Sequence, residues 1–131
     1  MRKVFVENVL TSADSASIAV AATAVIYTRS FKLAFADFFC VSYKATGTAP
    51  DVLIELEQGV DRPTTEGSSD TAWVEPENMA NIETNLTTTT WHHKNLSPVT
   101  LPYARFKITG NAGNHATDTV LTMKISRQEE L

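Results

Sequence analysis

Apolar and polar residues alternate with a period of two along much of the chain after residue 30. Successive side chains of a strand point to opposite faces, so one set enters a core while the other meets water. These stretches are also rich in the β-branched and aromatic residues that favour strands. Their apolar sets are Leu33, Phe35, Phe39, Val41 and Tyr43; Val52, Ile54 and Leu56; Ala104, Phe106 and Ile108; and Leu121, Met123 and Ile125. The pattern predicts an all-β protein.

Turn-forming residues separate the alternating stretches at 46–51, 58–70 and 110–114. Many short strands joined by such turns are typical of a sandwich, a jelly roll or a small barrel. We expect one domain, residues 1–131, folded as an antiparallel, jelly-roll-like β-sandwich. About eight strands are predicted, near residues 3–10, 17–27, 31–46, 51–58, 71–75, 81–90, 102–109 and 117–127.

The segment 13–26 has the least distinct pattern. Its alanines suit a helix as well as a strand. Ile18, Val20, Val25 and Ile26 favour the strand. For the whole chain we expect at least about 40% strand and no helix longer than about two turns.

Asp37 interrupts one of the apolar sets. A buried carboxylate costs several kcal/mol unless it is hydrogen-bonded. We expect Asp37 to accept bonds from backbone amides or to pair with an arginine such as Arg29 or Arg105; the alternative is a break in the strand. Cys40 is the sole cysteine, which excludes an internal disulfide, and it is expected to be a small buried residue rather than a nucleophile.

Charge and hydropathy exclude several classes of function. The formal net charge is -4, from 15 acidic and 11 basic residues, which argues against nucleic acid as the main partner. The most apolar run, residues 16–26, is shorter than the ~20 residues of a membrane helix. Glu7 and Asp14 interrupt what would be the apolar stretch of a signal peptide. We therefore expect a soluble chain, mature from Met1, with no membrane partner.

The candidate chemical groups do not form a recognised catalytic pattern. His92 and His93 are adjacent and would face opposite ways on a strand, and neither they nor His115 have metal-ligand spacing. Glu55 and Glu57 are two apart, at roughly 7 Å, a separation compatible with a glycosidase pair. Their alternation with apolar residues instead places them in solvent. We predict no catalytic residue, no metal site and no cofactor.

The two tryptophans leave two interpretations open. Burial in a sandwich core is the favoured one for Trp73 and Trp91. The alternative is exposure beside polar loops, where aromatic rings serve as sugar platforms or interface anchors.

Residues 43–57, 102–110 and 118–125 carry a resemblance to known proteins. Their order of strand, Pro-Asp turn, Trp-bearing middle and closing hairpin with an Asn/Gly loop resembles small virion structural proteins of tailed bacteriophages. The resemblance covers about residues 31–127 and includes decoration, or cement, proteins of capsids. It is a pattern of strands and turns and contains no catalytic residues.

The resemblance implies a protein made in the host cytoplasm and located on the capsid surface of the virion. Its partners would be the major capsid protein and further copies of itself, most simply a homotrimer around a local three-fold axis. The N-terminal segment would suit pairing with another chain's sheet edge, although it equally suits an ordinary first strand. The runner-up is a carbohydrate-binding or tail/neck accessory module that uses a tryptophan or Tyr103. Candidate partner contacts are Met1, Arg2, Lys3, Val4, Phe5, Trp73 and Trp91.

Overall fold

The computed structural model describes residues 2–10, 15–32, 36–76, 81–96, 101–115 and 117–130. Within this part of the chain there are ten strands and no helix, so no helix there could cross a membrane. The strands account for nearly half of the chain, as expected. They are β1 (Arg2–Asn8), β2 (Ser17–Ala19), β3 (Val25–Tyr27), β4 (Phe31–Lys32), β5 (Ala36–Thr46), β6 (Val52–Gly59), β7 (Glu83–Leu86), β8 (His92–Leu96), β9 (Tyr103–Gly110) and β10 (Val120–Glu130).

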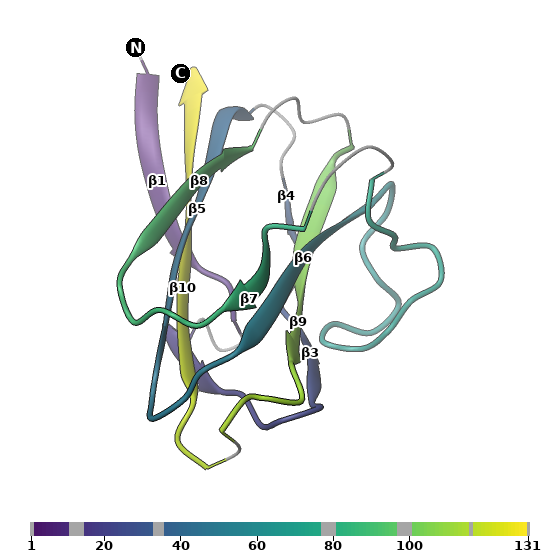
Figure 1. Cartoon of the computed structure of the whole chain (residues 1–131). Coiled ribbons are helices and arrows are strands. Elements are labelled where there is room, and N and C mark those ends of the chain that lie inside the picture. Colours follow the sequence, from purple (N-terminus) through teal and green to yellow (C-terminus); the bar gives the residue numbers. More distant parts are fainter. Residues whose placement is uncertain are drawn as a thin grey trace.

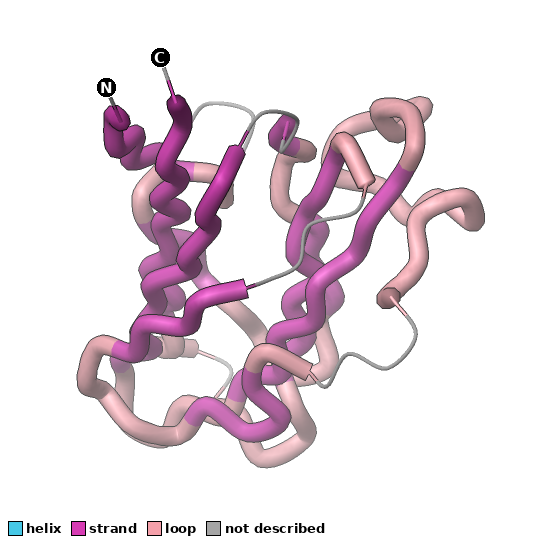
Figure 2. Tube along the Cα trace, turned by 90° about the horizontal axis from the view of Figure 1, so that it is seen from above, coloured by secondary structure: helices cyan, strands magenta, loops and turns pink. Residues whose placement is uncertain are grey.

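Two antiparallel sheets face each other as a β-sandwich (Figures 1 and 2). Sheet A has the order β1-β10-β5-β8, and β2 also pairs with β10. Sheet B has the order β3-β9-β6-β7, and β4 also pairs with β9. Because β1 and β2 pair with consecutive parts of β10, they form one interrupted edge strand. β3 and β4 do the same along β9, so the ten strands occupy eight positions.

The ten observed strands differ from the eight predicted ones at four places. The predicted strand 31–46 is divided into β4, in sheet B, and β5, in sheet A, and β8 was not predicted. The predicted strand 17–27 is divided, because residues 21–24 carry the chain from sheet A to sheet B. At this crossing Thr23 has a φ of 63° and its amide donates to Gly110 O at 2.8 Å. A Cβ at Gly110 would collide with the carbonyl oxygen of Ala21, so only glycine allows this approach. Likewise, the predicted strand 71–75 is only a single bridge, between Val74 and Gln58.

The inner faces of the sheets form the core. The alternating apolar residues of β5, β6, β9 and β10 lie between the sheets as predicted, and Val41, Ile54, Ile108 and Leu121 are each 0% exposed. Phe39 packs with Phe31 and Phe106, with ring centroids 5.5 to 6.3 Å apart. Of the predicted core, Leu33 and Phe35 lie outside the described residues.

Asp37 lies at an irregularity of β5. The pairing with β10 shifts there, since Phe38 faces Gln128 while Ala36 faces Glu129. Asp37 is therefore the extra residue of a bulge within a continuous strand, and the alternative of a break in the strand is wrong. Its side chain lies outside what the structure describes, so its hydrogen bonding stays a prediction.

A long loop, residues 60–76, covers the outer face of sheet B (Figure 1). It buries Arg105, whose guanidinium lies 4.4 Å from the ring centroid of Tyr27 and 5.1 Å from that of Trp73. Arg105 Nε donates to Glu57 Oε1 at 2.8 Å, and Nη1 donates to the carbonyl oxygen of Ser68 at 2.7 Å. The expectation that Arg105 and Glu57 face water is wrong, because the loop excludes water from their side of the sheet: their side chains are 0% and 12% exposed.

Trp73 is held in the same layer. It is 3% exposed, but it packs on the outside of sheet B rather than between the sheets. Its indole lies over Gly59, where any Cβ would collide with the ring. The loop thus forms a small second core around a cation–π stack.

Replacing Glu57 should destabilise the protein strongly. Glu57→Ala leaves the buried guanidinium of Arg105 without its counter-ion, which costs about 3–5 kcal/mol in comparable pairs. The free energy of unfolding from urea titration measures the loss. Glu55→Ala, two residues away on the same side of β6, is the matched control and should cost less than about 1 kcal/mol. Equal losses from both variants would contradict the role of the ion pair.

Glu75 should make stability depend on pH. Its partial burial and the nearby Glu55 raise its pKa above the ordinary value. A raised folded-state pKa favours the protonated form, so this contribution is complete in acid and is lost as pH rises through the folded pKa. Glu75→Gln should therefore be more stable than the wild type at pH 7, and the difference should disappear below about pH 4. Thermal unfolding at several pH values tests this, and a pH-independent difference would contradict it.

Candidate binding surface

The outer face of sheet A has no covering loop in the described chain, and its outward side chains are exposed or half-buried. They come from four neighbouring strands and form rows across the sheet. In one row, Val6 of β1 is opposite Ser126 of β10, which is opposite Cys40 of β5, which is opposite Asn95 of β8.

A shallow trough of about 300 Å³ runs across this face. Its floor is low because the two central strands carry small residues there, Ser42 on β5 and Ser126 on β10. Val6, 65% exposed, stands on one side, and Trp91, 43% exposed, stands on the other. The remaining lining residues are His93, Lys124 and Ile125. The trough is therefore a polar floor between two apolar walls.

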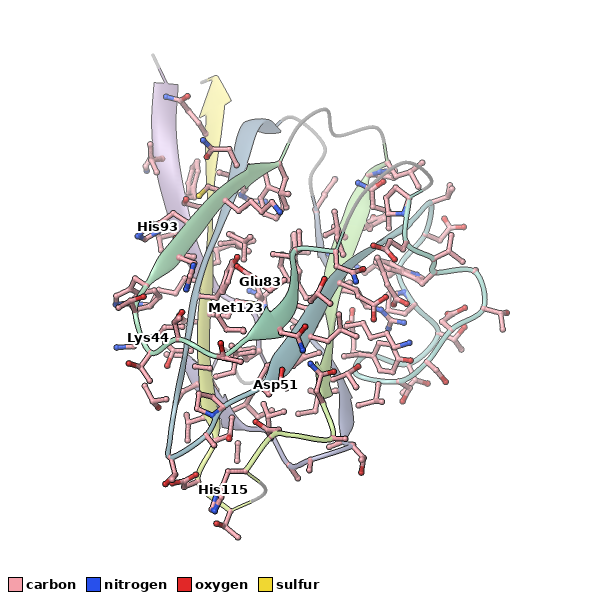
Figure 3. All side chains as sticks on the ribbon, viewed as in Figure 1. Lys44, Asp51, Glu83, His93, His115 and Met123 are labelled. Carbon is pink, nitrogen blue, oxygen red and sulfur yellow. The ribbon has the colours of Figure 1, made fainter. Side chains whose placement is uncertain are left out.

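Neighbouring side chains fix the position of Trp91. Its ring stacks on His93, with centroids 6.2 Å apart and an angle of 8° between the planes. His93 in turn shares a 2.7 Å hydrogen bond between its Nδ1 and Ser42 Oγ. Lys44 Nζ lies 5.0 Å from the Trp91 centroid. Figure 3 shows His93 and Lys44 on the outer side of sheet A, with Met123 between the sheets.

The charge of this face is opposite to that of the whole chain. Lys44 and Lys124 point outward from β5 and β10, and none of the described outward side chains of β1, β10, β5 and β8 is acidic. The chain as a whole has a net charge of -4. The trough is thus suited to a partner that combines apolar and acidic groups.

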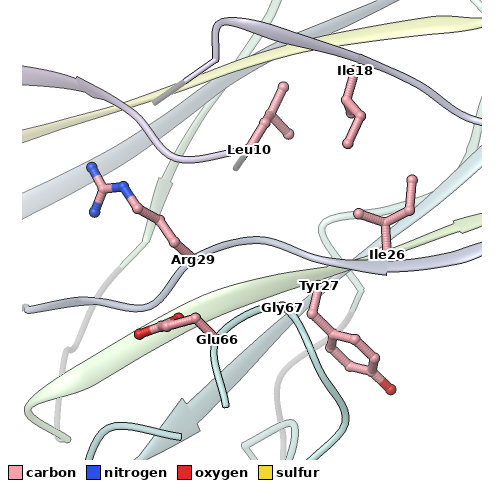
Figure 4. Close-up of a pocket in the computed structure, with 7 residues that line it drawn as sticks. All are labelled: Leu10, Ile18, Ile26, Tyr27, Arg29, Glu66 and Gly67. Atoms are coloured by element: carbon pink, nitrogen blue, oxygen red, sulfur yellow. The ribbon is translucent and has the colours of Figure 1, made fainter. Parts of the chain in front are cut away.

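A second hollow, of about 240 Å³, lies at the side of the sandwich (Figure 4). Leu10, Ile18 and Ile26 gather on one side of it and Arg29 and Glu66 on the other. The two charged groups already have partners in the protein. Arg29 Nη2 donates to the carbonyl oxygen of Asn8 at 3.0 Å. Glu66 accepts hydrogen bonds from the backbone amide, at 2.7 Å, and the hydroxyl of Ser30. This hollow joins the covering loop to the sheet edges and is a weaker candidate for ligand binding.

The titratable groups are dispersed rather than gathered into one centre. His92 Nδ1, on β8, lies 3.8 Å from Glu83 Oε1 on β7, and His115 Nδ1 lies 2.8 Å from Asp118 Oδ1 in the loop between β9 and β10. Burial and a hydrogen bond to Glu83 raise the pKa of Tyr43. A hydrogen bond from the hydroxyl of Thr48 lowers the pKa of Asp118. In the described part of the chain, no group of three or more His, Cys, Asp or Glu residues could hold a metal ion.

The sequence-predicted contact residues have different locations. Met1 and the side chain of Arg2 lie outside what the structure describes. Lys3 and Val4 are exposed and Phe5 is half-buried, all on the edge strand of sheet A. Trp73 is buried by its own loop.

Two predictions of burial are wrong on this face, because both residues point outward from sheet A. The exposed position of Trp91 contradicts its expected burial. Cys40 is a free thiol, half-buried on the outer face rather than in the core.

The serines and the lysine at the floor of the trough were not among the residues predicted to bind a partner. Ser42, Lys124 and Ser126 occupy outward positions of the alternating pattern. The small serines at such positions in two strands are the feature of the sequence that could have predicted a trough. That feature is visible only after β5 and β10 are known to be neighbours.

No family model, curated protein or solved structure matches this chain.

The two tryptophans should respond differently to truncation. Trp73→Ala empties a buried site and should cost about 3–5 kcal/mol of unfolding free energy. Trp91→Ala removes a partly exposed ring and should cost less than about 1 kcal/mol. Denaturant titration of both variants measures the difference. A loss at Trp91 as large as that at Trp73 would show that its ring supports the fold rather than forming a binding wall.

Proposed function

We propose that this protein is a non-enzymatic virion structural protein that decorates the outer lattice of a tailed-phage capsid and stabilises the head. The uncovered outer face of sheet A, with its trough between Val6 and Trp91, is the observation that carries the proposal. The resemblance of residues 31–127 to phage structural proteins supplies the partner, the major capsid protein. The capsid segment that fills the trough would be extended and would carry apolar and acidic side chains.

We further propose that the sandwich is a jelly roll. Among its eight strand positions, the first (β1 and β2) pairs with the eighth (β10), and the second (β3 and β4) pairs with the seventh (β9). The third, β5, pairs with the sixth, β8, and the fourth, β6, pairs with the fifth, β7. A long hairpin folded over on itself has these pairings. Jelly rolls form many viral capsid proteins and lectins, which supports a binding or structural role.

The stabilisation follows from thermodynamic linkage. A protein that binds the assembled lattice, and not its separate subunits, lowers the free energy of the assembled state alone. Because the lattice repeats, even weak individual contacts hold a self-associated protein firmly through avidity.

Capsids that lack the protein should therefore lose their DNA at a lower temperature, or on milder osmotic shock, than decorated capsids. Adding the purified protein back should restore resistance in proportion to occupancy, measured by DNA release and by co-sedimentation. Trp91→Ala and Lys124→Glu should reduce co-sedimentation at least about 10-fold, since each removes a contact worth 1.4 kcal/mol or more at an interface centre.

Val74→Ser is the matched control. Val74 is 59% exposed, but it lies on the loop that covers sheet B, so this variant should bind like the wild type. Equal robustness of decorated and bare capsids, with the protein found only in tails, would refute the cement role.

A carbohydrate-binding role is the second candidate, and the position of Trp91 favours it. An exposed indole beside the hydroxyls of Ser42 and Ser126 offers stacking and hydrogen bonds to a sugar ring. Retention of the wild type, but not of Trp91→Ala, on a glycan array would support this role. The protein would then bind a receptor at the virion surface rather than stabilise the capsid.

A further inference from the structure

β1 is the longest strand at a free sheet edge in the described part of the protein. It has seven residues and pairs only with β10 and only on one side. The other edges are β8 with five residues, β7 with four, and the interrupted pair of β3 and β4. An exposed edge strand presents unpaired N–H and C=O groups along its length and can accept another strand.

Two outward side chains of β1 are apolar and exposed. Val4 and Val6, on its outer face, are 60% and 65% exposed. Charged side chains on an edge, including inward-pointing ones, commonly protect it from pairing with another chain, and Glu7 is already paired with Arg127 Nη2 of β10 at 2.9 Å. Such an edge can still accept a strand whose charges are opposite in sign. In β1 there is one charge of each sign on the inward-pointing set, Lys3 and Glu7, placed symmetrically about Phe5.

This symmetry makes β1 complementary to itself. If two copies of β1 lie antiparallel with Phe5 opposite Phe5, then Val4 of each copy faces Val6 of the other, and Lys3 of each faces Glu7 of the other. Cross-strand pairs of these kinds stabilise a sheet. The same test fails for β8, the other edge of sheet A, because pairing His92–Leu96 with itself would place Lys94 opposite Lys94.

We propose that two copies of this protein associate through β1, edge to edge and antiparallel, about a two-fold axis at Phe5. A C2 contact of this type uses the same patch on both copies and closes after one pair. It joins the two A sheets into one continuous sheet, with the two troughs on its same face. The inference does not depend on the capsid role, and it replaces the trimer implied by the resemblance with a dimer for the free protein.

The exposed valines allow a test that leaves the fold intact. The wild-type full-length chain should sediment as a dimer at micromolar concentration. Val4→Lys/Val6→Lys places lysine opposite lysine at both outer pairs and should raise the dimer dissociation constant at least about 10-fold. Val4→Lys/Val6→Glu places lysine opposite glutamate in the proposed register and should restore the dimer. Sedimentation equilibrium measures all three proteins, and a cooperative thermal unfolding transition shows that each variant folds.

Val60→Lys/Val74→Lys is the matched control. These valines are 66% and 59% exposed, but they lie on the loop over sheet B, so the variant should remain dimeric. A wild type that stays monomeric or forms a trimer would overturn the proposal, as would a dimer that survives Val4→Lys/Val6→Lys. Failure of Val4→Lys/Val6→Glu to recover would overturn the register centred on Phe5. Co-sedimentation with capsids tests the capsid role separately.

Discussion

β10 lies inside sheet A, bonded to β1 and β2 along one side and to β5 along the other. The last strand of the chain thus pairs with the first, and sheet A is complete only when both ends of the chain have met (Figure 1). Such pairings close very long loops, whose entropy must be offset by burial of the inner faces. The alternating apolar residues of β5, β6, β9 and β10 supply that burial. At residues 21–24 the chain packs closely against Gly110 and crosses between the sheets. The edge strand before the crossing, β2, is therefore in sheet A, and the one after it, β3, is in sheet B.

The outer faces of the two sheets differ in whether a loop covers them. The loop after β6 folds back over sheet B and buries Arg105 between Tyr27 and Trp73, with Glu57 as its counter-ion. Burying a guanidinium is costly unless its charge and donors are matched. Sheet A has no such cover in the described chain, and its outer face retains an aromatic wall, two lysines and a serine floor.

The free edge at β1 and the uncovered face of sheet A are adjacent features of one surface, because Val6 belongs to both. A pair of copies joined at β1 would present two troughs side by side on one continuous sheet. For a protein that binds a repeating lattice, two linked sites convert weak contacts into firm attachment without any additional contact. Edge pairing and lattice binding would thus reinforce each other, although each can be measured alone.

The sequence by itself determined the all-β class and the inward set of each long strand, because the period of two depends only on local backbone geometry. Val52, Ile54 and Leu56 were placed correctly for this reason, and so was the turn before Asp51. Only the tertiary structure decided what happens to the outward set. Arg105 is buried and Lys124 is not, although both alternate with core residues in the same way. The difference arises from a loop that returns from another part of the chain, and no local pattern contains that information. The trough has the same origin: Ser42 and Ser126 are more than eighty residues apart, and they form one floor only because β5 and β10 are neighbours.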